Sequence, residues 1–537
     1  MRAPAARGVW RNPLLWAAIA VGTALRSVGL FGQVLIGDEV HAFRFVPQVA
    51  FPRVLWAYDQ TANSPPLNAW LRLFFAAGIP PSETALRIPV LASGIAVLLI
   101  VPWWIARRID ARTAIIAAWL LAVWPPLVLY SRIMRPYMPF VLLGAAAAGA
   151  FYEWWRTRRR SAGVAYALLA AAAIYFHLLA APFVLAPAVF LAVEVLRSGP
   201  RTLPPRRDIA IVVGMLTAAL LAFVVPAWPD LTALVSARRV PLTLGRGDAR
   251  AVTRLLCGTD VAGLALIVAA AMLAGAVRLA RDDATLLRYV MILSIAQLLA
   301  VPLLSPKFVQ HGPILARYLI VLAVPAVMLA AIGLAARTWI RRVATPLLMA
   351  ALFFSGPLAS ASRFVNPLGM TEQLAGAAPR TNDALQPLPD AYRLLATGPP
   401  GPIIEHPFPP SARFLLPLTG YWEVHRRPIR IAPARQGLGD PRLGLRSIVA
   451  GDPQRLLDSD AVFLIVHRDW QSEIGRAFIP DSGPVRGRRL VARNLEWMRA
   501  EATHLDGELE RSWGPPDASD AQIAIWDLTR VRARQGR

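Results

Sequence analysis

Apolar runs of about 20 residues recur along the first two thirds of this chain and constrain its fold more than any other feature. The first extends from Leu14 to Leu35. Ten more follow at 86–106, 112–131, 137–155, 162–178, 179–196, 209–228, 261–280, 286–304, 314–336 and 343–360. A helix of about 20 apolar residues crosses the hydrocarbon core of a bilayer. The pattern predicts a mainly α, polytopic transmembrane helical bundle with eleven spans.

Charge placement predicts the orientation of this bundle. The chain has a formal net charge of +24, which by itself would suggest a nucleic-acid partner. However, its arginines gather in alternate loops, at 107–108, 156–160, 197–207, 278–288 and 337–342. Cytoplasmic loops of membrane proteins carry such an excess of arginine. We therefore exclude nucleic acid and expect a bacterial cytoplasmic (inner) membrane protein. The N-terminus is expected in the cytoplasm, followed by a retained signal anchor.

The composition changes after residue 360 and predicts a second domain. No later apolar run reaches spanning length, and proline, glycine and acidic residues become more frequent. Strand-like runs at 402–405, 461–467 and 522–528 alternate with helical patterns such as 488–502. We expect a transmembrane domain at 1–360, with its first outer loop at about 34–85. A soluble α/β domain at 361–537 would follow, placed outside the cytoplasm by the number of spans.

The first outer loop contains an amphipathic pattern. Apolar residues recur at helical spacing, at Leu67, Trp70, Leu71, Phe74 and Phe75, with Asn68 and Arg72 on the opposite face. The stretch is too short to span a bilayer, so we interpret it as an interfacial helix. An ordinary short packed helix is the alternative. Pro65-Pro66 is typical of a rigid helix start.

An acidic pair, Asp38-Glu39, directly follows the first apolar run. Burial and mutual repulsion both disfavour two adjacent carboxylates at a membrane border, so we expect a use for one of them. Several cations share the predicted outer face or the outer half of a span: Arg26, Arg87, Arg132, Arg135, Arg238, Arg239, Arg246, Lys307 and Arg317. Each alone is compatible with snorkelling or solvation. Together they indicate an anion site, because guanidinium groups match phosphate oxygens.

A carboxylate base, a phosphate clamp and an interfacial helix at one membrane face suit a lipid-phosphate-linked donor. Further motifs support a family resemblance, in this order: Leu25-Arg26-Ser27-Val28-Gly29-Leu30, Gly37-Asp38-Glu39, Ser64-Pro65-Pro66-Leu67, Ala85-Leu86-Arg87-Ile88-Pro89, Tyr130-Ser131-Arg132, Arg135-Pro136-Tyr137, Tyr175-Phe176-His177 and Ala316-Arg317-Tyr318-Leu319. Over residues 25–336 the chain resembles the GT-C membrane glycosyltransferases. The closest branch contains the protein O-mannosyltransferases and the bacterial aminoarabinose transferases.

This resemblance implies an inverting transfer of a sugar from a polyprenyl-phosphate donor to a hydroxyl of a lipid, glycan or protein. Asp38 is then the expected general base, and Glu39 assists it. The expected phosphate-side residues are Arg26, Arg132, Arg135, Lys307 and Arg317. The expected acceptor region contains His41, Asn63, Ser64, Tyr137 and His177. Ser64 replaces the histidine that the family often has before Pro-Pro, which leaves the acceptor class open.

We expect no metal or other cofactor, because arginine can neutralise the phosphate. Three histidines of the tail are His406, His425 and His467. A metal or acceptor site is one interpretation, but their spacing matches no metal-binding motif, so we favour surface residues. Cys257 is the only cysteine, so no intrachain disulfide forms.

Two other functions remain open at this point. A transporter or flippase for a lipid-linked or anionic substrate would use buried charges nearer the membrane midplane, and an inactive homologue would serve as a scaffold.

Overall fold

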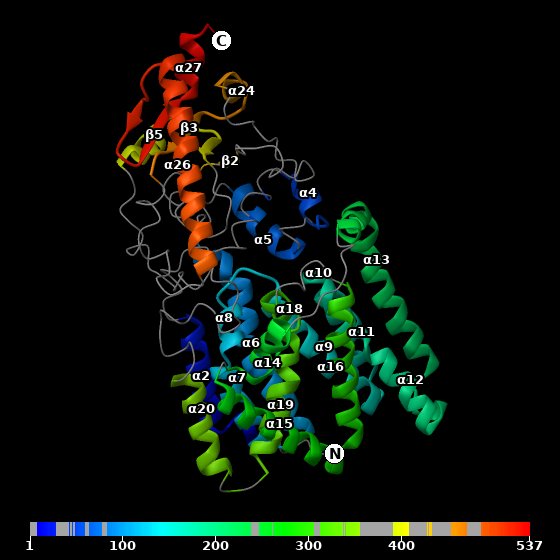
Figure 1. Cartoon of the computed structure of the whole chain (residues 1–537). Coiled ribbons are helices and arrows are strands. Elements are labelled where there is room, and N and C mark those ends of the chain that lie inside the picture. The colour runs from blue at the N-terminus through cyan, green and yellow to red at the C-terminus, as the bar shows by residue number, and fades with distance from the viewer. Residues whose placement is uncertain are drawn as a thin grey trace. The chain divides into compact units, whose positions relative to one another are not determined.

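The computed structural model describes residues 8–27, 42, 46, 49–58, 64–77, 83–237, 246–259, 261–304, 312–336, 338, 340–354, 390–407, 427, 429–431, 453–469 and 485–536. The chain divides into two compact units (Figure 1). The helical unit comprises Met1–Phe31, Phe51–Trp70 and Thr84–Thr371, and the sheet unit comprises Gly32–Ala50, Leu71–Glu83 and Glu372–Arg537. The domain boundary expected at residue 360 stays a prediction.

The helical unit consists of helices of very different length. Their bounds are α2 Pro13–Ser27, α4 Phe51–Val54, α6 Glu83–Arg108, α7 Ala111–Val123, α8 Pro125–Tyr130, α9 Tyr137–Thr157, α10 Arg160–Phe176, η2 Leu178–Ala180, α11 Ala181–Leu185, α12 Pro187–Ser198, η3 Pro200–Thr202, α13 Arg206–Ala237, α14 Arg246–Cys257, α15 Ala262–Asp282, α16 Ala284–Leu304, α18 Gly312–Tyr318, η4 Ile320–Leu322, α19 Ala323–Leu334, η5 Ile340–Ala344 and α20 Thr345–Phe354. Helix α5, Pro65–Ala76, contains residues of both units.

The chain is mostly helical, and every predicted apolar run coincides at least in part with one or more of these helices. Within the described residues, five helices are long and apolar enough to cross a membrane: Ala85–Arg108, Leu178–Ser198, Arg206–Ala233, Ala262–Asp282 and Ala284–Leu304. Shorter apolar helices occupy Pro13–Ser27, Ala111–Val123, Arg160–Phe176, Ile320–Leu334 and Arg342–Phe354. The count of eleven spans stays a prediction.

Small residues permit close helix crossings in this unit. A Cβ added at Gly275 of α15 would lie 1.8 Å from the Leu329 carbonyl oxygen of α19. A Cβ added at Gly333 would lie 2.1 Å from the Ala271 carbonyl oxygen. Only glycine therefore lets these two backbones approach as they do, a packing mode typical of membrane helices.

The predicted arginine-rich loops meet at one end of the helical unit. Four ion pairs and one hydrogen bond connect them: Arg107–Glu153 at 3.4 Å, Arg156–Asp283 at 3.9 Å, Arg160–Asp208 at 2.8 Å, Arg288–Glu194 at 2.9 Å, and Arg278 Nη1 donating to the Ile332 carbonyl at 3.3 Å. We call this the paired end. The bundle therefore gathers these loops on one side, as alternate placement along the chain requires.

Three features of the helical unit and of α5 differ from the sequence-based expectations. Helix α14 was not expected, because its polar sequence contains no apolar run. Helix α13 continues to Ala237, nine residues beyond the predicted span. Asn68 of α5 is only 2% exposed, so the face opposite the apolar stripe is not a solvated one. Helix α5 does begin at Pro65, as Pro65-Pro66 predicts.

The sheet unit contains a five-stranded sheet in the order β2-β1-β3-β5-β4. The strands are β1 Ile403–His406, β2 Ile429–Ile431, β3 Phe463–His467, β4 Ala518–Ser519 and β5 Ile523–Asp527. Strand β1 runs parallel to β2 and β3, while β5 is antiparallel to β3 and β4. The other elements are η7 Asp390–Tyr392, α22 Arg393–Thr397, α24 Pro453–Leu457, α26 Val485–Trp513 and α27 Leu528–Arg534. A core that includes Leu464, Leu505 and Trp526 joins the strands to α26.

A buried polar group lies within this sheet. The Tyr392 hydroxyl donates to both Glu405 carboxylate oxygens, each at 3.1 Å. His467 Nε2 contacts the same carboxylate, and Glu405 and His467 are both 0% exposed. His406 is 1% exposed. The surface interpretation is therefore wrong for His406 and His467, because the strands that carry them are covered on both faces. His425 lies outside the described residues.

Candidate functional site

Arg26 connects three segments at the end of the helical unit opposite the paired end. It is 0% exposed, and its Nε donates to Ser131 Oγ at 3.1 Å. Its Nη1 donates to the carbonyls of Gly22 at 2.8 Å and Ala122 at 3.4 Å, and its Nη2 donates to that of Leu121 at 3.0 Å. Four of its five N–H groups thus bind neutral acceptors of α2, α7 and the turn after α8. A buried cation needs such compensation for its lost hydration.

The turn at 131–136 places two more of the predicted arginines. Arg132 is 3% exposed, and its Nη1 donates to the Leu25 carbonyl of α2 at 3.2 Å. Arg87 of α6 is 0% exposed and close enough to Arg132 for their charges to repel. Arg135 is partly buried in the same turn. Like charges at small separation in an apolar surrounding favour the presence of an anion.

Aromatic rings surround Arg317. Its guanidinium carbon lies 5.6 Å from the ring centroid of Tyr137 and 5.5 Å from that of Tyr318. Such cation–π contacts stabilise a positive charge that has lost its hydration. Tyr137 also packs edge-on against Tyr130, with centroids 4.9 Å apart. These ring contacts join the start of α9 to the end of α18.

His177 completes this cluster from the end of α10. Its ring centroid is 5.6 Å from that of Tyr137 and 5.5 Å from that of Tyr318. The Leu179 backbone N–H donates to His177 Nδ1 at 3.2 Å. An accepting Nδ1 assigns the proton of a neutral imidazole to Nε2, so His177 presents an N–H donor.

Gln297 of α16 holds two backbone segments of the cluster. Its Nε2 donates to the Leu179 carbonyl and to the Tyr318 carbonyl, each at 3.0 Å. Gln297 is 0% exposed, and its Oε1 has no hydrogen-bond partner within the described ranges. The residue thereby fixes the distance between the turn after His177 and the helix that carries Arg317. In the sequence, Gln297 is recognisable as a polar side chain in the middle of an apolar span.

The first-loop segment 51–58 attaches beside the same cluster. The Tyr58 backbone N–H donates to Asp230 Oδ2 at 3.0 Å, and Arg53 forms an ion pair with Asp230. The Tyr175 hydroxyl donates to the Leu55 carbonyl at 2.5 Å, and that of Tyr58 donates to the Tyr175 carbonyl at 3.1 Å. Tyr175 lies two residues before His177. The predicted first loop therefore meets the end of α10.

We call the set Arg26, Arg87, Arg132, Tyr137, His177, Arg317 and Tyr318 the cationic cluster. It contains five of the predicted site residues: Arg26, Arg132, Tyr137, His177 and Arg317. Ser64, which directly precedes α5, is 4% exposed, and its Oγ has no hydrogen-bond partner in the described part of the chain. Five other predicted residues lie outside the described residues: Asp38, Glu39, His41, Asn63 and Lys307.

Sequence reasoning missed Tyr318, Gln297, Ser131 and Asp230 as site residues. Among the described residues, no group of three or more His, Cys, Asp or Glu side chains is arranged to hold a metal ion. The expectation that no metal is needed stays a prediction, because the acidic pair of the first loop is outside this set.

The fold and the cationic cluster together define a class: multi-pass helical proteins with a buried cationic and aromatic site at one end of the bundle. Residues 63–228 match a family model described as dolichyl-phosphate-mannose-protein mannosyltransferase. That segment contains Arg87, Arg132, Tyr137 and His177 but ends before Arg317. No curated protein matches the chain by sequence.

Two crystal structures of ArnT from Cupriavidus metallidurans have a similar fold. The apo form has a TM-score of 0.57 and 14% identity, over 95% of this chain and 96% of that chain. The form bound to undecaprenyl phosphate has a TM-score of 0.57 and 16% identity, over 84% of this chain and 93% of that chain. The chain thus resembles the GT-C membrane glycosyltransferases of the branch that contains ArnT and the protein mannosyltransferases.

Proposed function

We propose that this chain is an inverting glycosyltransferase that moves a sugar from a polyprenyl-phosphate donor to a hydroxyl of a lipid, glycan or protein acceptor. The observation that carries the proposal is the cationic cluster. Arg26, Arg87, Arg132 and Arg317 are each at most 8% exposed and gather at the end of the bundle away from the paired end. Charged side chains at such depth in a membrane protein usually mark a functional site.

The donor phosphate is assigned to Arg132 and Arg317, and Arg135 and Lys307 are proposed to assist them. Guanidinium groups bind phosphate oxygens with two parallel hydrogen bonds. Arg132 is 3% exposed and Arg317 is 8% exposed, and burial strengthens such bonds. Arg26 contributes its positive charge but acts mainly through position, since its Nε–H binds Ser131 Oγ and its Nη2–H binds the Leu121 carbonyl, which joins the turn that carries Arg132 to α7. Tyr137 and Tyr318 keep the Arg317 guanidinium in place.

The chemical step is assigned to the first loop. Asp38 accepts the proton of the acceptor hydroxyl, and Glu39 positions Asp38 or the hydroxyl. The hydroxyl oxygen forms a bond to the anomeric carbon while the bond from that carbon to the phosphate oxygen breaks. The electron pair of the broken bond remains on polyprenyl phosphate, and the arginines stabilise the resulting charge. Attack opposite the leaving phosphate inverts the anomeric centre.

The acceptor side is assigned to His41, Asn63, Ser64, Tyr137 and His177. His177 offers its Nε2–H to an acceptor or donor oxygen, because Nδ1 is occupied by the Leu179 N–H. The Ser64 hydroxyl is buried without a hydrogen-bond partner in the described residues, which suits a role in contacting a substrate hydroxyl.

The reaction is placed at the outer face of the cytoplasmic membrane. The paired end carries the arginine-rich loops, which the positive-inside rule assigns to the cytoplasm. The cationic cluster is at the other end of the helical unit, and the predicted number of spans assigns the soluble tail to the outside of the cytoplasm. A lipid-linked donor suits this location because nucleotide-sugars are cytosolic.

The assignment of Asp38 is tested with the Asp38→Asn variant. We expect transfer from a polyprenyl-phosphate-sugar donor to fall by about 10²–10⁴-fold, the usual contribution of a general base. Asp282→Asn is the matched control, because Asp282 is exposed at the paired end and its transfer should be unchanged. Undiminished transfer by a correctly inserted Asp38→Asn protein would contradict the role of Asp38.

The orientation is tested by cysteine labelling in a Cys257→Ala background. A cysteine at exposed Ala500 of α26 should react with a membrane-impermeant reagent in intact cells. A cysteine at exposed Arg201, in the arginine-rich segment 197–207 between α12 and α13, should react only after lysis. The reverse pattern would place both the site and the tail in the cytoplasm.

A further inference from the structure

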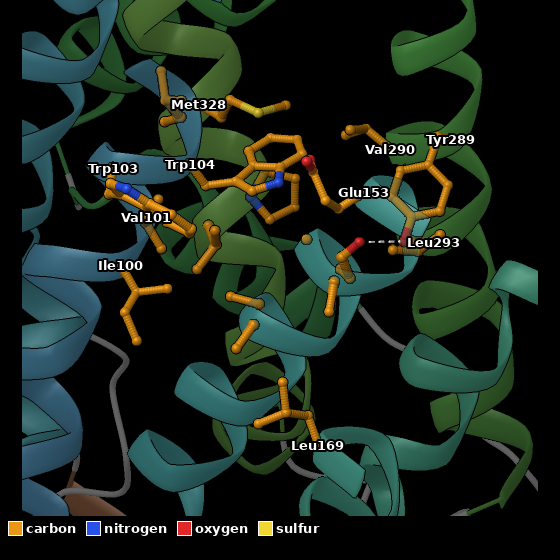
Figure 2. A pocket seen from close by; sticks show the side chains of 18 of the residues that line it. Ile100, Val101, Trp103, Trp104, Glu153, Leu169, Tyr289, Val290, Leu293 and Met328 are labelled. Atoms are coloured by element: carbon orange, nitrogen blue, oxygen red, sulfur yellow. Dashed lines mark hydrogen bonds between the residues drawn. The ribbon is translucent and has the colours of Figure 1, made fainter. Parts of the chain in front are cut away.

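An apolar cavity of about 460 Å³ lies in the half of the helical unit that adjoins the paired end (Figure 2). It is lined by residues of α6, α9, α10, α11, α16 and α19, among them Trp104, Ala145, Leu169, Leu293 and Met328. This volume is within the range of about 300–1,000 Å³ typical of ligand sites. The cavity is distinct from the cationic cluster. On α9 the lining extends from Ala145 to Glu153, which are eight and 16 residues from Tyr137, or about 12 and 24 Å along the helix axis.

The lining leaves few polar groups to receive a ligand inside the cavity. The Tyr289 hydroxyl points to the Ala148 carbonyl and donates to it at 2.8 Å, as the dashed line in Figure 2 shows. The remaining charged groups of the lining are Arg107 and Glu153, both near its paired end. An empty apolar cavity destabilises a packed bundle in proportion to its volume. We therefore expect an apolar chain to fill it.

The cavity is reachable from the surface of the unit. Trp103 is part of its lining and is 37% exposed, and the Arg107 side chain is 39% exposed. The Arg107 guanidinium lies 4.9 Å from the Trp103 ring centroid. A ligand could thus enter between these two side chains and place its polar end against the arginine.

Arg107 and Glu153, the two charged residues of the lining, belong to a charged group that has one positive charge in excess. Arg107 and Arg108 share Glu153, and Arg156 lies 3.9 Å from Asp283. Arg107 and Arg156 both repel Arg108, while Asp283 attracts it. Three arginines therefore face two carboxylates. A phosphodiester carries a single negative charge and would complete the balance, with bidentate bonding to a guanidinium.

We propose that this cavity is a binding site for an anionic phospholipid with a singly charged headgroup. One acyl chain occupies the apolar cavity between α6, α9 and α16, and the phosphate binds Arg107 and Arg156. The site is separate from the proposed transfer site, so either assignment can fail without the other. Its charge predicts a preference for phosphatidylglycerol over phosphatidylcholine, which has the same chains and no net charge.

The test uses native mass spectrometry of the full chain, purified in detergent and incubated with either lipid. The wild-type protein should retain phosphatidylglycerol in preference to phosphatidylcholine. Ala148→Phe fills the cavity and should reduce retention of phosphatidylglycerol by about tenfold or more, equal to about 1.4 kcal/mol. Ala218→Phe is the matched control, because Ala218 is exposed on α13, and it should retain the lipid as the wild type does.

The headgroup contact is tested by Arg107→Gln combined with Arg156→Gln. This pair should abolish the preference for phosphatidylglycerol, whereas Arg201→Gln should preserve it. If Ala148→Phe fails to fold, Ala165→Phe fills the same cavity from α10. Equal retention of both lipids by the wild type would overturn the proposal. So would unchanged retention in both cavity variants, or displacement of phosphatidylglycerol from this cavity by polyprenyl phosphate.

Discussion

Arginine side chains have different partners at the two ends of the helical unit. At the paired end, arginines meet carboxylates, as in Arg160–Asp208 and Arg288–Glu194, and most of these guanidinium groups are partly exposed. In the cationic cluster, Arg26 and Arg317 are buried, and they contact carbonyls, a hydroxyl and aromatic rings. Arginine at the paired end holds loops together. Arginine in the cationic cluster creates a positive potential that suits an anionic ligand.

The largest effect on stability is expected at Arg26. Arg26→Leu removes four hydrogen bonds between α2, α7 and the turn at Ser131, and buried acceptors without donors cost about 1–3 kcal/mol each. We expect a loss of at least about 3 kcal/mol, measured by thermal unfolding in detergent. Arg201→Leu, on an exposed position, is the control. A change within about 0.5 kcal/mol, the range of neutral surface substitutions, would show that Arg26 does not brace the bundle.

A smaller effect is expected at Gln297. Gln297→Leu keeps the volume but removes two hydrogen bonds, worth about 0.5–1.5 kcal/mol each. Since these bonds align His177 and Arg317, we expect the KM for the donor to rise about tenfold with a smaller change in kcat. Leu293→Ala, one turn away on α16, is the control for a purely structural loss. Equal thermal destabilisation with an unchanged KM would contradict a positioning role.

The smallest effect is expected at the paired end. Glu153→Gln removes the partner of Arg107 and Arg108, but such partly exposed pairs contribute about 0.2–1 kcal/mol. Thermal unfolding at low and high salt measures this contribution, and the difference from the wild type should diminish as salt rises. If Glu153→Gln lowered the free energy of unfolding by more than about 2 kcal/mol independently of salt, the arginines of the paired end would be as important to stability as those of the cationic cluster.

The sequence predicts the elements of the membrane part well because both signals are local. Apolar runs locate the helices, and the loop arginines indicate that their ends share one side. The sequence does not reveal which contacts a given polar residue makes in the fold. Arg26 and Arg132 look alike in sequence, yet Arg26 donates four hydrogen bonds to neighbouring segments. Asn68 is buried although the helical pattern places it on a polar face, since periodicity describes one helix and not its neighbours.

Contacts between distant segments explain what was missed. Asp230 lies in an apolar stretch and gains its role only through Arg53 and Tyr58, more than 170 residues away. Gln297 had a recognisable signal, a polar side chain within an apolar span, but its partners follow from the fold alone. The acidic pair Asp38-Glu39 rests on sequence and resemblance, as do His41, Asn63 and Lys307, because all five lie outside the described residues.

The central claim is that the cationic cluster, and not the paired end, binds the donor phosphate. Binding of polyprenyl phosphate to purified Arg132→Gln, Arg317→Gln and Arg107→Gln proteins tests it most directly. Loss of a charged hydrogen bond costs about 1.5–3 kcal/mol, so the first two variants should bind at least about tenfold more weakly. Arg107→Gln should bind as the wild type does. Wild-type affinity in both cluster variants, or a loss confined to Arg107→Gln, would contradict the account.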